Sequence, residues 1–142
     1  MNSQLSAIVA IILLLLSCSK DNSSTSSANL PVLTTDNVGL LTLNSAQSST
    51  TITSDGGSTI TAKGIVWSTD SNPTIELSTR SDDGIGIEAY TSTMTGLAVD
   101  VNYYVRSYAT NSIGTAYSAQ KQFVTSSEFY KRCDHWKSNL DA

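Results

Sequence analysis

Leu97-Ala98-Val99-Asp100-Val101-Asn102-Tyr103-Tyr104-Val105-Arg106-Ser107-Tyr108-Ala109-Thr110-Asn111 is the stretch of sequence that decides the fold. Its middle part, residues 101–109, alternates between two sets of side chains. One set comprises Tyr103, Val105, Ser107 and Ala109, and the other comprises Tyr104, Arg106 and Tyr108. Alternation with a period of two, in a run rich in aromatic and β-branched residues, predicts a strand with one face on a core.

The residues before this strand suggest how the chain enters it. Leu97 lies six residues before Tyr103, and Val99-Asp100 is suited to a turn between them. That spacing resembles the tyrosine corner of Greek-key sandwiches, in which a tyrosine hydroxyl is tied back to the backbone at the E–F corner. We therefore expect an all-β, immunoglobulin-like sandwich of about seven strands, with residues 101–109 as its central F strand.

Working outward, short strand-like runs are separated by turn signals. Asp55-Gly56-Gly57, Asp82-Asp83-Gly84 and Asn111-Ser112-Ile113-Gly114 mark the turns, because glycine adopts positive φ at little cost. The predicted strands are residues 32–35, one within 41–54, 59–68, 89–94, 101–109 and 115–124. Trp67 lies in the middle of the third run, where such sandwiches bury a large aromatic side chain. Short strands with turns at this spacing favour a sandwich over alternating strands and helices.

Composition limits the class of protein. The chain has 142 residues, enough for one domain with tails, and only 14% of them are charged. The net charge of −4 and the lack of a basic patch argue against nucleic acid as a partner. The two cysteines, Cys18 and Cys133, do not resemble a disulfide framework.

The amino-terminal residues predict export and lipid attachment. Residues 5–16 are almost wholly apolar, too short to span a bilayer comfortably but suited to the apolar part of a signal peptide. Leu15-Leu16-Ser17-Cys18 resembles a bacterial lipobox, which implies cleavage before Cys18 and its lipidation. The first residues carry no Lys or Arg, which departs from the usual signal-peptide pattern. The alternatives to a lipoprotein signal peptide are a short membrane anchor or a buried apolar segment. Several acyl chains would anchor the protein stably, since each buried methylene contributes about 0.8 kcal/mol.

Four regions follow from these patterns. We expect a lipoprotein signal peptide over 1–17, a Ser/Thr-rich flexible tether over 18–29, the sandwich over 30–126, and an irregular tail over 127–142. The expected location is the cell envelope, with the lipid anchored in the outer membrane. The sandwich would then face either the periplasm or the exterior. The expected oligomeric state is a monomer.

The sandwich region resembles a known family. Its motifs are Ser54-Asp55-Gly56-Gly57, Ala62-Lys63-Gly64-Ile65-Val66-Trp67-Ser68-Thr69, Asn72-Pro73-Thr74-Ile75, Thr95-Gly96-Leu97, and residues 103–117. Together, from about Pro31 to Thr125, they are similar to the fibronectin type III-like repeat of surface lipoproteins from Bacteroidota-type bacteria. Val66 stands where that family often has cysteine, and only one copy is present where tandem copies are common. The resemblance implies a spacer, adhesion or binding module on a cell surface, without catalytic residues or cofactors.

The tail fits that resemblance poorly. If Lys131-Arg132 is encoded AAA AGA, deleting one adenine from that run allows Lys-Asp-Val-Thr-Ile-Gly-Asn-Gln-Thr-Trp-Met to follow Tyr130. That string resembles the opening of a FISUMP-type major paralogous domain. We therefore hypothesise that the chain is the front of a longer surface protein, involved in glycan binding or uptake, that is interrupted by a frameshift.

Chemistry-bearing side chains are few. His135 is the single histidine and no nucleophile motif accompanies it, so we expect no enzyme activity. Cys133 and His135 are too few to close a zinc site. Aspartates in the predicted turns could ligate Ca²⁺, but no calcium-loop spacing is present and aspartate is also the usual turn residue. We therefore expect no metal.

An aromatic face is the candidate ligand site. Tyr104, Arg106 and Tyr108 are predicted on the outer face of the F strand, and Tyr117 on the next strand can join them. Such a face can stack on sugar rings or anchor a partner protein. The alternative is cross-strand aromatic and cation–π pairing that only stabilises the sheet.

Overall fold

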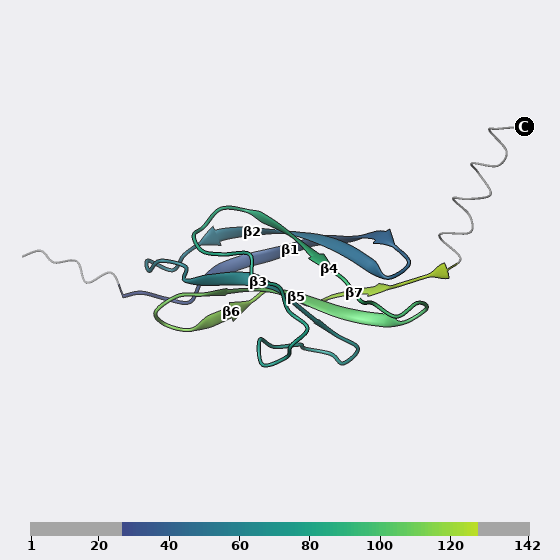
Figure 1. Ribbon diagram of the computed structural model, residues 1–142. Helices are drawn as coiled ribbons and strands as arrows, with labels where there is room; N and C mark the ends of the chain where they lie inside the picture. The colour runs from purple at the N-terminus through teal and green to yellow at the C-terminus, as the bar shows by residue number, and fades with distance from the viewer. Residues whose placement is uncertain (1–26, 128–142) are drawn as a thin grey trace, which may run out of the picture.

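The computed structural model describes residues 27–127, apart from the side chains of residues 40 and 41. Within that range the chain forms seven strands and two antiparallel sheets (Figure 1). The strands are β1 (Val32–Thr42), β2 (Ser45–Ser54), β3 (Ala62–Ser68), β4 (Tyr90–Met94), β5 (Asn102–Thr110), β6 (Thr115–Tyr117) and β7 (Lys121–Val124). The predicted signal peptide, Cys18, most of the tether, and the tail with Cys133 and His135 lie outside the described residues.

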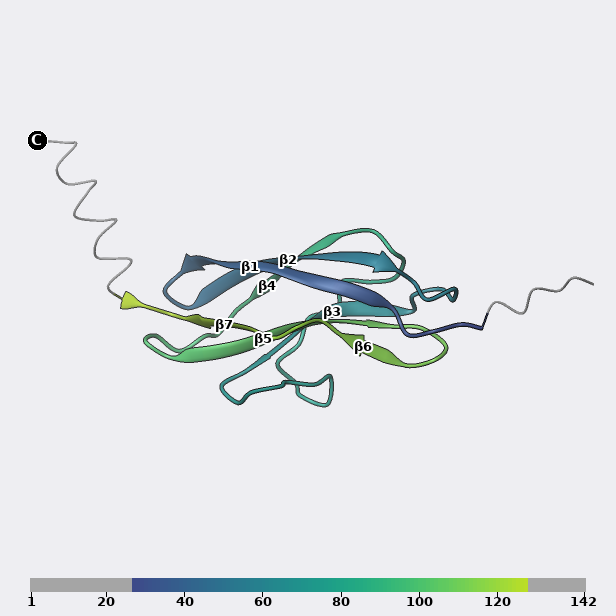
Figure 2. The same cartoon turned by 180° about the vertical axis from the view of Figure 1, so that it is seen from behind.

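The two sheets pack face to face. One has the order β1-β2-β4, and in the other β5 pairs with β3 on one side and with β6 and β7 on the other (Figures 1 and 2). This arrangement matches strands A-B-E and C-F-G of an immunoglobulin-like sandwich. The predicted fold class is therefore confirmed, with β5 as the central strand of its sheet.

Two strand predictions need correction. The first strand, predicted over 32–35, continues to Thr42, with irregular pairing to β2 after Thr35. The last strand, predicted as one run over 115–124, is divided into β6 and β7. The division arises at Ser118, a buried residue whose hydroxyl accepts a hydrogen bond from the Ser107 N–H at 3.0 Å.

The tyrosine corner is present. The Tyr103 hydroxyl accepts a hydrogen bond from the Ala98 N–H at 2.9 Å, and Asp100 takes a φ of 57° in the turn between them. The ring of Tyr103 stacks on Phe123 of β7, with centroids 5.7 Å apart. The spacing from Leu97 to Tyr103 therefore predicted both the hydrogen bond and the turn.

The core has two apolar clusters. The larger contains Ala46, Ile65, Trp67, Met94, Leu97 and Val105, and the smaller contains Leu33, Ile52, Ile60 and Ala109. Trp67 is 9% exposed, as its position in the middle of a strand predicted. The side chain of Tyr90 packs against both clusters.

Buried hydroxyl groups link the two sheets within this core. We call them the hydroxyl layer: Thr35 on β1, Thr50 on β2, Ser107 on β5 and Ser118 after β6. The Ser107 hydroxyl lies 2.6 Å from that of Thr35 and 2.5 Å from that of Thr50, and Thr35 lies 2.5 Å from Ser118. Since each hydroxyl both donates and accepts, burial leaves none of them without a hydrogen bond.

Candidate ligand-binding site

The predicted aromatic face lies on the outer side of the β3-β5-β6 sheet. Tyr108 of β5 is directly opposite Tyr117 of β6, so the two rings share that side. The guanidinium of Arg106 lies over the Tyr117 ring, 4.5 Å from its centroid. The structure thus brings Arg106, Tyr108 and Tyr117 together, while Tyr104 lies further along β5, opposite Ser68 and Gln122.

Residues 69–83, which we call the covering segment, lie over part of this face. The segment runs along the free edge of β3, where the Trp67 N–H donates to the Thr79 carbonyl at 3.0 Å. The Ser81 N–H donates to the Ile65 carbonyl at 2.8 Å, and the Asp83 N–H donates to the Lys63 carbonyl at 2.8 Å. In Figures 1 and 2 this part of the chain forms the loops on the outer side of β5. Because the edge hydrogen bonds are satisfied, the segment is part of the sheet rather than a free loop.

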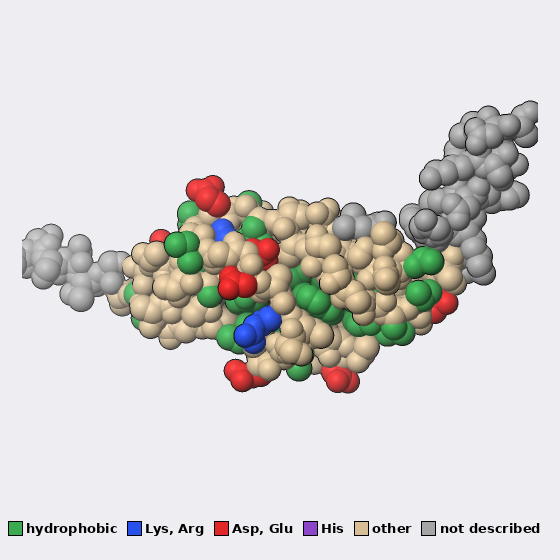
Figure 3. Space-filling model, viewed as in Figure 1, with side chains coloured by type: hydrophobic (Ala, Val, Ile, Leu, Met, Phe, Trp, Pro, Cys, Tyr) green, Lys and Arg blue, Asp and Glu red, His purple; other side chains and the backbone are tan. Residues whose placement is uncertain are grey.

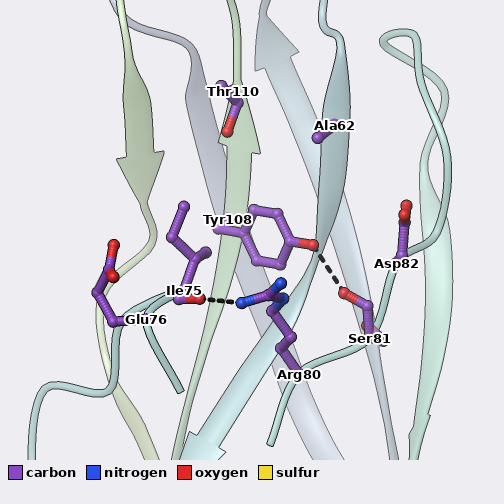
Figure 4. A pocket seen from close by; sticks show the side chains of 8 residues that line it. All are labelled: Ala62, Ile75, Glu76, Arg80, Ser81, Asp82, Tyr108 and Thr110. Atoms are coloured by element: carbon purple, nitrogen blue, oxygen red, sulfur yellow. Dashed lines mark hydrogen bonds between the residues drawn. The ribbon is translucent and has the colours of Figure 1, made fainter. Parts of the chain in front are cut away.

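The covering segment removes Tyr108 from solvent. Tyr108 is 4% exposed, and its hydroxyl donates to the Ser81 carbonyl at 2.7 Å (Figure 4). Burial raises the pKa of this tyrosine above its usual value of 10.0, and the charges of Asp82 and Asp83 act in the same direction. Tyr108 thus lies on the outer face of β5, as predicted, but the covering segment buries its ring there, because alternation along β5 does not reveal what covers that face.

The other three residues of the predicted face are partly exposed. The Tyr117 hydroxyl accepts a hydrogen bond from the Ile75 N–H at 3.1 Å, and the Arg106 Nε donates to the Ser118 carbonyl at 3.2 Å. Arg106 and Tyr117 thus make the cation–π pair that was the alternative to a ligand site. Tyr104 retains a partly exposed ring.

Gly64 allows the covering segment to lie so close. A Cβ at this position would be 2.3 Å from the Ser81 carbonyl oxygen and 2.9 Å from the Tyr108 ring. Real Cβ atoms do not approach other atoms so closely, so a larger residue would displace the segment or the ring. The glycine therefore sets the distance between β3 and its neighbour.

A hollow of about 480 Å³ lies where the covering segment ends over β3 and β5 (Figure 4). Its walls and floor are formed by Ala62, Ile75, Glu76, Arg80, Ser81, Asp82, Tyr108 and Thr110. Figure 4 shows Glu76 and Asp82 on opposite sides, with Arg80 and Tyr108 between them. The hollow joins polar acceptors to a small apolar floor, which suits a small polar ligand.

Sequence reasoning missed this hollow. Glu76 and Arg80 lie in a segment without strand or helix periodicity, and Asp82 was recognised only as a turn residue. Asp82 does serve the turn, since its Oδ1 accepts from the Gly84 N–H at 3.1 Å, and Asp55 does the same for Gly57 at 2.8 Å. No local signal marked the hollow, because the burial of Tyr108 depends on a segment that has no periodicity of its own.

Two further buried polar side chains serve the fold. Lys63 is 4% exposed, and its ammonium donates to the carbonyls of Glu88 at 2.7 Å and Gly86 at 3.2 Å. It also lies over the Tyr90 ring, 5.2 Å from the centroid. The Tyr90 hydroxyl donates to the Gly64 carbonyl at 2.7 Å, and burial raises the pKa of Tyr90 to about 12. These contacts anchor residues 86–90 against β3.

The surface is mostly neutral and polar. Figure 3 shows few charged side chains on one face of the molecule, and they are scattered rather than gathered into a single patch. Within residues 27–127, no three His, Cys, Asp or Glu side chains lie close enough to hold a metal ion. None of the described residues form a helix that is long and apolar enough to cross a membrane.

Comparison with known proteins gives structural neighbours alone. No protein-family model matches the chain, and no curated protein is significantly similar to it. The crystal structure of a run of titin domains is 21% identical, with a TM-score of 0.44, and the match covers 70% of this chain and 32% of that one. A structure described as a myokine is 20% identical, with a TM-score of 0.44, covering 70% of this chain and 99% of that one. The chain thus spans about a third of the titin fragment. By its own strand order and pairing, residues 32–124 form an immunoglobulin-like β-sandwich.

Proposed function

We propose that this protein is a non-enzymatic lipoprotein of the cell envelope, whose sandwich acts as a spacer and as a contact module for protein or glycan. The observation that carries the proposal is the position of the two ends of the described chain. The segment that precedes β1 and the end of β7 lie at opposite ends of the elongated sandwich (Figures 1 and 2). A module with this geometry separates whatever precedes it from whatever follows it.

The separation can be estimated from the strands. β1 has 11 residues and β5 has nine, and a strand rises about 3.3 Å per residue, so the sandwich adds about 30 Å. The Ser/Thr-rich residues that precede it add flexible reach. If Cys18 carries lipid, the hollow and residue 127 are held away from the bilayer surface.

Lipid attachment is tested by feeding cells an alkyne analogue of palmitate and measuring label on the purified protein. We expect label on the original chain and none on Cys18→Ser. Cys133→Ser is the matched control, since it removes the other thiol and should keep the label. Label that persists in Cys18→Ser, or is absent from the original chain, would overturn the anchor.

A contact function is favoured by the hollow beside Tyr108. The Glu76 carboxylate at its side makes no hydrogen bond or ion pair with the rest of the described sandwich, and neither apolar core cluster includes a residue of the hollow. Under the frameshift hypothesis, the sandwich would be the front part of a longer glycan-binding or uptake protein, and it would still act there as a spacer and contact module. Sequencing the gene beyond codon 142 tests it, and the absence of a frame that continues the tail would remove it.

A further inference from the structure

We propose that the hollow beside Tyr108 binds a neutral sugar ring, and that this is the ligand of the module. The inference rests on the contact function proposed above and names its ligand class. Of the predicted face of Tyr104, Arg106, Tyr108 and Tyr117, only Tyr108 lines this hollow. The site proposed here adds Glu76, Arg80 and Asp82 to it.

The ligand-facing groups of the hollow are mostly acceptors. The exposed Glu76 carboxylate has no hydrogen-bond partner among residues 27–127. Asp82 uses Oδ1 to accept from Gly84, which leaves Oδ2 for a ligand. Because an ionised carboxylate only accepts hydrogen bonds, the ligand must supply donors.

The positions of these two carboxylates indicate which kind of ligand could donate hydrogen bonds to both. Glu76 and Asp82 lie on opposite sides of the hollow, with the Tyr108 ring between them (Figure 4). A single ammonium group would need the carboxylates to converge on one point. A ring that carries several hydroxyl groups instead presents donors in different directions, so it can reach both sides at once.

The apolar part of the hollow suits the carbon face of a sugar. Ala62 and Ile75 line it together with the small exposed part of Tyr108, and the two carboxylates stand on opposite sides. Its volume of about 480 Å³ lies within the range of about 300–1,000 Å³ that is usual for small-ligand sites. One or two sugar rings would fit within this volume.

The charge of the hollow disfavours acidic glycans. Residues 27–127 carry Asp or Glu at eight positions and Lys or Arg at four, a net charge of −4. Two of the four cations are occupied elsewhere, since Lys63 binds backbone carbonyls and Arg106 lies over Tyr117. The Arg80 Nη1 donates to the carbonyls of Ile75 and Leu77, so this guanidinium holds the wall of the hollow. A uronate or sulfate would therefore meet two carboxylates and one guanidinium, which leaves an excess of one negative charge around the hollow.

The walls are fixed before any ligand arrives. The Arg80 contacts, the Tyr108–Ser81 hydrogen bond and the edge pairing to β3 hold residues 75–83 in place. A rigid site loses little entropy on binding, which raises affinity for a small ligand.

The test is a titration of the full ¹⁵N-labelled chain in a detergent that contains no sugar. The probes are gluco-, manno-, galacto- and xylo-oligosaccharides, a uronate-bearing oligosaccharide, and spermidine as a cationic probe. We expect at least one neutral oligosaccharide to shift amide signals of residues 62, 75–82 and 108–110. Glu76→Gln with Asp82→Asn should weaken that binding at least about tenfold, since each loses a charge-assisted hydrogen bond. Asp36→Asn with Glu88→Gln, which removes the same charges away from the hollow, should leave it unchanged.

The other outcomes would overturn the proposal. These are no shift with any neutral oligosaccharide, shifts confined to the Tyr104 end of β5, a response to the uronate or to spermidine alone, or binding that the double variant retains. None of them affects the lipid label on Cys18 or the spacer geometry, so failure of the sugar site is distinguishable from failure of the proposed function.

Discussion

The Tyr103 hydroxyl and the Ala98 N–H, five residues apart, are joined by a hydrogen bond of 2.9 Å across the turn that leads into β5. This contact closes the corner between the two sheets. Phe123 packs on the same tyrosine ring, so the corner has a polar and an apolar component that can be separated by substitution.

Tyr103→Phe should destabilise the fold by about 1 kcal/mol, because it removes the hydrogen bond and keeps the ring. The measurement is urea denaturation followed by tryptophan fluorescence. Tyr104→Phe is the matched control, since the Tyr104 hydroxyl has no partner among the described residues, and it should change the midpoint little. Equal midpoints for the two variants would show that the corner hydrogen bond contributes no stability.

Ser107→Ala should cost about 2 kcal/mol, although it removes a single oxygen. The Ser107 hydroxyl contacts both Thr35 and Thr50 in the hydroxyl layer, and burial leaves those two groups without water to replace it. Ser49→Ala is the control, because its 3.1 Å contact with Thr91 lies on the outer face of the sheet. The control should stay within about 0.5 kcal/mol of the original chain, and a comparable loss in both variants would argue against a special role for burial.

Gly64→Ala should destabilise the fold by about 1–3 kcal/mol and should also disturb the hollow, since the new methyl group would overlap the Ser81 carbonyl. Gly39→Ala provides the comparison, because a Cβ at Gly39 meets nothing within 4 Å. Both variants can be compared by denaturation and by the amide spectrum of residues 75–83. An unchanged spectrum in Gly64→Ala would contradict the close approach.

Alkaline pH should unfold the protein through Tyr90. Burial raises its pKa to about 12 in the folded state, against 10.0 in the unfolded chain, so the folded state holds the proton more tightly. The contribution to stability is complete below about pH 10 and is lost as the pH rises towards about 12. Tyr108, whose pKa is also raised, acts in the same direction.

This pH dependence is measured from denaturation midpoints between pH 9 and pH 12, together with the absorbance of tyrosinate. Tyr90→Phe should flatten the fall in stability over that window, whatever it costs at neutral pH. A slope as steep in Tyr90→Phe as in the original chain would assign the alkaline transition to other groups.

The sequence predicted the elements whose pattern is local. Alternation along residues 101–109 identified β5, and the spacing from Leu97 to Tyr103 identified the corner. Glycines that follow Asp55 marked a turn with φ values of 74° and 79° at Gly56 and Gly57. In each of these the physical cause lies within a few residues of the feature.

The candidate site could not be predicted from the sequence, because the contacts that form it join residues far apart in the chain. Whether Tyr108 is exposed depends on residues 75–83, which pair along β3 without any periodicity of their own. The division of the last strand likewise depends on Ser118 reaching Thr35, 83 residues away in the chain. Neither contact leaves a pattern in a window of ten residues.

The hydroxyl layer has a consequence for how the two sheets are aligned. The hydrophobic effect has no directional preference. Two purely apolar faces would therefore permit one sheet to shift over the other by a fraction of a residue. A hydrogen bond tolerates little such movement, because its strength falls steeply with angle and distance. We therefore expect the four buried hydroxyl side chains to favour a single alignment of the sheets, and an all-aliphatic replacement to allow several.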